Sequence, residues 1–210
     1  MFQVTEISSQ SFEQSIDQGP IVSPPLFRDF KIIPIKALPL VAAVVIGLVI
    51  SIAGNWTWAL DFYHVVGGGF WTAIDLFLGF VIGPIMNKMS IPARMEFTSK
   101  LMPKVVLIMP TLVTMTLGSG FQLARKLNNL STGAPAHGWL VLSFAIVGVM
   151  TVIAMGILQP ANVTVLFELK KEHPNGAVIA KLMKRFIYTA GIMGAMQVGT
   201  LVIMTRVASL

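Results

Sequence analysis

The sequence predicts an all-α membrane protein in which five transmembrane helices form a four-helix bundle core plus one N-terminal helix. Three observations predict this class. Of the 210 residues, 55% are hydrophobic and only 11% are charged, against about 25% charged residues in soluble domains. Five stretches are long and apolar enough to cross a bilayer, which takes about 20 residues as a helix. The cations, finally, alternate between connections as the positive-inside rule expects.

The five predicted spans cover residues 37–54, 59–86, 105–123, 138–160 and 186–207. Residues 37–210 therefore form a single transmembrane helical domain. Residues 1–36 begin with a polar stretch and end with prolines, bulky apolar residues and cations. We expect a retained cytoplasmic tail followed by a segment that lies along the lipid headgroups.

The cations predict an N-in, C-out orientation. With the N-terminus in the cytoplasm, inside segments hold twelve of the 15 Lys and Arg residues, and the outside keeps Arg125, Lys126 and Arg206. This places the chain in the cytoplasmic (inner) membrane. The net charge of +6 is dispersed over short loops, which favours contact with anionic lipid over nucleic acid. Other membrane subunits or a second copy stay open as partners.

The chain has no cysteine, which excludes disulfides, iron–sulfur clusters and covalent c-type haem. A haem or metal would need His, Met, carboxylate or Tyr ligands. Phosphate-binding loops, zinc-protease motifs, nucleophile elbows and dinucleotide fingerprints are also absent from the sequence. No catalytic residue is assigned, and whether the protein is an enzyme stays open.

His64 and Asp75 lie in the otherwise apolar stretch of residues 62–86 in the second span, and ionisable groups at membrane depth mark functional sites. Eleven residues separate them, which places both on nearly one helix face, about 16 Å apart along the axis. His64 is a candidate cofactor or metal ligand, or else a neutral histidine bonded to a neighbouring helix. Asp61, one turn earlier, either orients the imidazole or is a solvated residue at the helix start.

His137 opens the fourth span on the same predicted outer side as His64. The two imidazoles could supply both axial ligands of a b-type haem or two ligands for copper. The alternative for His137 is a solvated interfacial residue, and His173 in a cytoplasmic loop is expected to be solvated. The 13 methionines are interpreted as adaptable packing rather than a copper path.

Asp75 lies near the middle of its span, where an ionised carboxylate is costly. We expect it to be protonated or paired with a polar residue at similar depth, the candidates being Thr114, Thr116, Thr151 and Gln197. A bond to Gln197 would join the second and fifth helices. The functional alternative is a carboxylate that handles protons or cations.

Glycines follow His64 at positions 67–69 and must allow something to approach closely. That neighbour is either another helix backbone or a flat macrocycle beside its ligand. Further small-residue steps are Gly79 with Gly83 and, in the fifth span, Gly191 with Ala195 and Gly199.

Several short motifs follow one another along about residues 58–206. They are His64-Val-Val-Gly67-x-x-x-Trp71, Gly83-Pro84, Leu117-Gly118-Ser119-Gly120, Trp139-Leu140, Gln159-Pro160 and the closing helix from Gln197 to Met204. This pattern resembles the copper-resistance D-like integral-membrane superfamily, whose wider circle includes the haem-b-binding protoporphyrinogen oxidases of the J type. The resemblance implies a four-helix core preceded by one extra helix, with His64 as the matching candidate ligand.

The leading functional hypothesis is a protein that binds b-type haem, or as second choice copper, through His64 near the outer face. It would serve electron transfer or a haem- or copper-linked process. Two hypotheses from other classes stand beside it. One is a non-catalytic accessory subunit of a larger membrane complex, in which Asp75 and the glycine faces serve helix association. The other is a small cation or copper permease that depends on Asp75.

Overall fold

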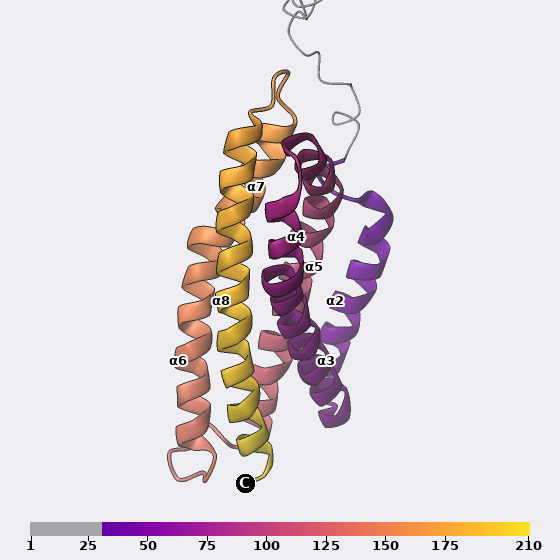
Figure 1. Ribbon diagram of the computed structural model, residues 1–210. Helices are drawn as coiled ribbons and strands as arrows, with labels where there is room; N and C mark the ends of the chain where they lie inside the picture. The colour runs from indigo at the N-terminus through magenta and orange to yellow at the C-terminus, as the bar shows by residue number, and fades with distance from the viewer. Residues whose placement is uncertain (1–30) are drawn as a thin grey trace, which may run out of the picture.

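The computed structural model describes residues 31–210, and this part of the chain is helical apart from short connections, with no strand. Five helical rods run side by side (Figure 1). In chain order they are η2 (Ile35–Ala37) with α2 (Leu38–Ala53); α3 (Thr57–Leu76), η3 (Phe77–Ile82) and α4 (Gly83–Lys88); α5 (Ile91–Lys126); α6 (His137–Ile153), η4 (Ala154–Leu158) and α7 (Gln159–Leu169); and α8 (Gly176–Ala208). All five are long and apolar enough to cross a membrane, so the predicted fold class is confirmed.

The helices extend beyond the predicted spans at one end of the bundle. The third helix begins at Ile91 instead of residue 105, the fourth continues to Leu169, and the fifth begins at Gly176. Hydropathy detects only the apolar middle of a helix, whereas these ends are polar and hold side-chain pairs such as Lys100 with Glu96 (2.6 Å). Of the predicted tail, residues 1–30 lie outside the described residues.

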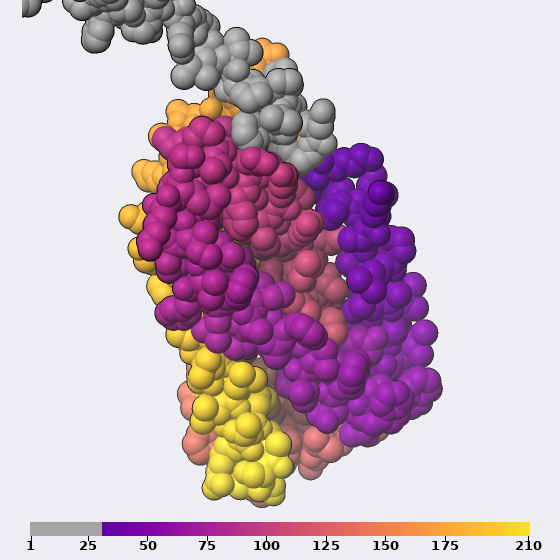
Figure 2. Space-filling model, turned by 45° about the vertical axis from the view of Figure 1, so that its right-hand side comes forward, coloured from indigo at the N-terminus to yellow at the C-terminus, as the bar shows by residue number. Residues whose placement is uncertain are grey.

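Four of the rods form the core, and α2 lies beside them. The α8 helix contacts α3, η3, α5, α6 and α7, while α2 contacts α3 and α5. Only Leu48 and Ser51 of α2 are buried, and Figure 2 shows α2 in indigo as a separate ridge at one edge. Large apolar side chains such as Leu40, Trp58 and Val152 are exposed on the outside of the bundle, as lipid contact requires.

Two π-helical segments precede prolines. The N–H groups of Gly83 and Gln159 donate to carbonyls five residues back, those of Leu78 and Ala154, and Pro84 and Pro160 follow directly. A proline has no N–H and crowds the preceding turn, so one wider turn lets each helix continue past it. The second rod is therefore continuous from α3 through η3 to α4, and the fourth from α6 through η4 to α7.

The second and fifth rods meet at their backbones. A side-chain carbon on Gly79 would overlap the Cα of Gly191, and one on Gly194 would lie 2.9 Å from the backbone nitrogen of Leu76. Gly79 and Gly191 thus act as small interface residues, as the sequence predicts. Gly199 has no neighbour of this kind. Every four residues along an α-helix rotate the side-chain direction by about 40°, so Gly199, eight residues after Gly191, has turned out of the interface.

Candidate functional site

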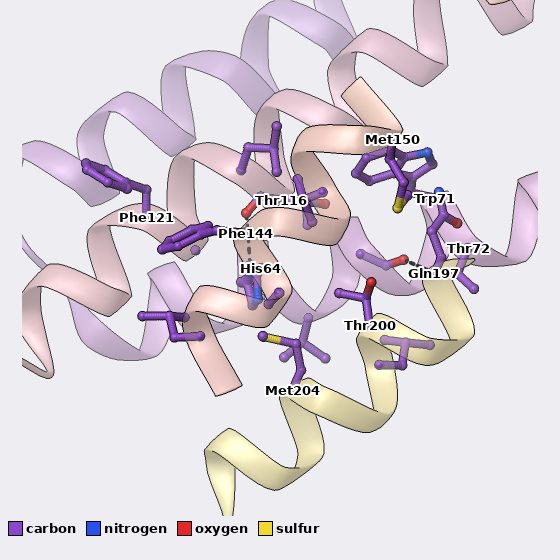
Figure 3. Close-up of a pocket in the computed structure, with 18 of the residues that line it drawn as sticks. His64, Trp71, Thr72, Thr116, Phe121, Phe144, Met150, Gln197, Thr200 and Met204 are labelled. Atoms are coloured by element: carbon purple, nitrogen blue, oxygen red, sulfur yellow. Dashed lines mark hydrogen bonds between the residues drawn. The ribbon is translucent and has the colours of Figure 1, made fainter. Parts of the chain in front are cut away.

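A cavity of about 300 Å³ lies between α3, α5, α6 and α8. We call it the histidine cavity; Figure 3 shows its walls. Its lining includes His64, Gly68, Trp71, Gly120, Met150 and Met204. The lining is predominantly apolar with a few polar groups, which is the usual character of a ligand site.

His64 is fixed by a hydrogen bond to the neighbouring helix α5. Its Nδ1 lies 2.9 Å from the carbonyl oxygen of Thr116, and because a carbonyl only accepts, Nδ1 donates. In the neutral imidazole the lone pair is then on Nε2. Gly120 leaves the space that the imidazole ring of His64 occupies, since a side-chain carbon on Gly120 would lie 2.6 Å from that ring.

Asp61 does not serve as the orienting group. It is exposed to the surroundings, and the hydrogen bond that orients His64 goes to Thr116. Of the two interpretations of Asp61, the structure favours the solvated residue at the helix start. The bond to α5 is what either interpretation of His64 requires, because a ligand histidine also donates its second N–H to a carbonyl. The two interpretations differ in what faces Nε2.

His137 is not among the residues that line the histidine cavity. It begins α6 and lies about one turn before Leu140, the first lining residue of that helix. Its Nδ1 is buried without a hydrogen-bond partner. Met150 of α6 and Met204 of α8 line the cavity instead (Figure 3). Within residues 31–210, no group of three His, Asp or Glu side chains lies together.

The glycines after His64 have different neighbours. A side-chain carbon on Gly67 would lie 2.8 Å from the hydroxyl of Thr116, whereas one on Gly69 would meet nothing within 4 Å. Gly67 therefore lets α3 pack closely on α5, as the helix-packing interpretation predicts. Gly68 lines the histidine cavity, one turn from His64.

Asp75 is paired with Gln197 in the interior of the bundle. The Gln197 Nε2 donates to Asp75 Oδ2 at 2.8 Å, and the two side chains are 1% and 4% exposed. Among the candidate partners named from the sequence, Gln197 is therefore the one whose bond to Asp75 the structure contains. The bond joins α3 to α8, while Asp75 Oδ1 and Gln197 Oε1 are buried without a partner.

A second cavity of about 250 Å³ lies on the far side of this pair. We call it the aspartate cavity; its polar lining residues are Asp75, Thr114, Thr151, Gln159 and Asn162. Trp71, one turn before Asp75, lines both cavities. Sequence reasoning missed Asn162, because the fourth span was predicted to end at residue 160. The signal available in the sequence was an amide directly after Gln159-Pro160 that is followed by the mostly apolar residues 163–167.

No family model matches this chain, and no curated protein or solved structure matches it either. Fold and composition define an all-helical protein of the membrane-spanning class. The resemblance to the copper-resistance D-like superfamily stays a prediction, and function has to be argued from the two cavities.

Proposed function

We propose that the protein binds b-type haem in the histidine cavity through His64 Nε2 and serves electron transfer in the membrane. One observation carries the proposal: His64 lines a predominantly apolar cavity together with Met150 and Met204. The hydrogen bond from its Nδ1 to the Thr116 carbonyl leaves Nε2 as the nitrogen with the lone pair, and bonds of this kind orient metal-binding histidines. Copper is the second choice at the same nitrogen.

The residues of the cavity fit such a group. Two lining residues, Phe121 and Phe144, are 51% and 41% exposed on the outside of the bundle, which supports entry of an amphipathic macrocycle from the bilayer. The volume is at the small end of the 300–1,000 Å³ typical of ligand sites, and the opening leaves room for the remainder of a larger ligand. The thioethers of Met150 and Met204 are candidates for a second ligand, and His/Met ligation is known for haem iron.

The chain's own side chains have separable roles in this proposal. Thr116 holds the proton of His64 at Nδ1, and Gly120 leaves room for the ring. The aromatic and aliphatic walls exclude water, and the second ligand would tune the reduction potential. A bound haem would supply one-electron transfer.

The test is a reduced-minus-oxidised visible spectrum of the full chain purified in mild detergent. We expect a b-type α-band in the native protein, no band in His64→Ala, and an unchanged band in His173→Ala, because His173 is exposed outside both cavities. Met204→Leu and Met150→Leu identify the second ligand as the variant that changes the spectrum. The proposal would be contradicted if the native protein showed no b-type α-band and acquired none after incubation with haem and removal of the excess.

We also propose the N-in, C-out orientation in the cytoplasmic membrane. The connections at residues 89–90 and 170–175 and the helix ends beside them carry most of the described cations, which supports placing that end inside. Because the chain has no cysteine, a single introduced cysteine shows on which side of the membrane its position lies. On intact cells, Ser131→Cys should react with an impermeant maleimide and His173→Cys should react only after permeabilisation; the opposite pattern would reverse the orientation.

A further inference from the structure

Two residues that line the aspartate cavity each carry a buried oxygen without a hydrogen-bond partner. These oxygens are Asp75 Oδ1 and Asn162 Oδ1, on side chains that are 1% and 4% exposed. An amide oxygen and an ionised carboxylate oxygen only accept hydrogen bonds. Buried acceptors of this kind are unfavourable unless a donor or a positive charge reaches them.

Residues 31–210 supply no positive charge there. No Lys, Arg or His is among the residues that line the aspartate cavity. Gln197 donates one N–H to Asp75 Oδ2, and the Trp71 indole also interacts with this carboxyl, but both groups are neutral. An ionised Asp75 at this depth would therefore lack a counter-charge, which is costly in a membrane-spanning bundle.

Neutral oxygens surround the same space. The Thr151 hydroxyl donates its proton to the Val147 carbonyl at 2.8 Å, which leaves its lone pairs free to accept. Thr114 and Gln159 also line the cavity. Both flanking rods are π-helical nearby, since η3 begins two residues after Asp75 and η4 ends four residues before Asn162. Such wider turns often occur at functional sites.

We propose that the aspartate cavity binds one monovalent metal cation of the Na⁺ or K⁺ class, with Asp75 Oδ1 and Asn162 Oδ1 as ligands and Thr151 as a neutral ligand. One carboxylate balances one positive charge, and hard oxygen donors suit such ions. At about 250 Å³ the cavity also has room for waters that complete the coordination. Three methionines line it too, Met109, Met155 and Met193, but the atoms without a partner are the oxygens. The proposal does not rest on the haem proposal.

The first experiment titrates NaCl or KCl against choline chloride at constant ionic strength and pH, and follows the melting temperature of the full chain in detergent. Binding to the folded state alone raises the melting temperature with the logarithm of the cation concentration above the Kd, by about 5–10 °C at 100 times the Kd. Asp75→Asn and Asn162→Leu should abolish the rise. The matched control is Asn87→Leu, since Asn87 is exposed and lines neither cavity.

Fluorescence of Trp71 gives an independent measurement of binding. Replacing the other three tryptophans by Trp56→Phe, Trp58→Phe and Trp139→Phe leaves Trp71, which lines the cavity, as the only one of the four. Thallous ion should then quench the fluorescence saturably and compete with K⁺. If Asn162→Leu does not fold, Thr151→Val should weaken the affinity severalfold.

Three outcomes would overturn the proposal. Equal melting curves in NaCl, KCl and choline chloride would mean that no cation binds. Stabilisation that follows pH alone would mean that Asp75 takes a proton instead. Stabilisation by Ag⁺ alone, lost in Met109→Leu, would mean that the sulfurs hold a soft ion.

Discussion

Gly79→Ala is expected to lower the free energy of unfolding by about 3 kcal/mol, the upper end for an overpacked core. The added carbon would overlap the Cα of Gly191 and lie 2.8 Å from its backbone nitrogen. A backbone cannot rotate away as a flexible side chain can, so α8 and η3 would have to separate. The measurement is reversible unfolding in mixed micelles followed by far-ultraviolet circular dichroism.

Matched glycines provide the controls for this prediction. Gly69 and Gly199 have no heavy atom within 4 Å of an added carbon, so their replacement by Ala should leave stability unchanged or raise it by up to about 1 kcal/mol through helix propensity. Gly191→Ala should be intermediate, because its added carbon would lie 3.3 Å from the Cα of Gly79. Equal effects of Gly79→Ala and Gly69→Ala would mean that the two helices do not meet at their backbones.

Gly120→Ala is expected to break the hydrogen bond between His64 and the Thr116 carbonyl. The added carbon would lie 2.6 Å from both Cε1 and Nδ1 of the ring, so the imidazole must move away from α5. If His64 is the haem ligand, the affinity for haem should fall by about 10–100-fold, as it does when the partners of other metal ligands are changed.

The displacement of His64 can be measured without any cofactor. The chain has three histidines, so His137→Gln with His173→Gln leaves one imidazole for ¹⁵N nuclear magnetic resonance. We expect Nδ1 to be protonated and Nε2 unprotonated in the neutral ring, and this pattern to be lost in Gly120→Ala. Gly118→Ala is the control, because its added carbon lies at an ordinary 3.5 Å from Leu48. An unchanged pattern in Gly120→Ala would refute the placement of the ring.

The five helices could be predicted because length and hydropathy determine them. The pairing of Asp75 with Gln197 could also be predicted, since few polar side chains lie at the middle of the spans and each needs a partner. The register of the glycine contacts was only partly predictable. Gly194 contacts α3 and Ala195 is exposed because of the rotation of α8 about its own axis. The spacing of small residues does not determine that rotation.

The partner of His64 could not be found from residue types. The hydrogen bond goes to the backbone carbonyl of Thr116, and because every residue has a carbonyl, the residue type at position 116 does not predict it. The residue type that reflects the contact is Gly120, because a side chain there would collide with the His64 ring. Asn162 was missed for a different reason. Hydropathy and Pro160 together predict that the helix ends near residue 160, whereas the wider turn of η4 lets it continue past the proline.

The hydrogen bond between Gln197 and Asp75 is shared by the walls of the two cavities, since Gln197 lines one and Asp75 lines the other. Any ligand that pulls Asp75 toward the aspartate cavity therefore changes the amide that the histidine cavity presents. By thermodynamic linkage, the factor by which one occupant alters the affinity of the second is the factor by which the second alters the first. If both cavities bind ligands as proposed, this single bond would couple the two sites, so that the concentration of the cation would alter the affinity of the histidine cavity for its ligand.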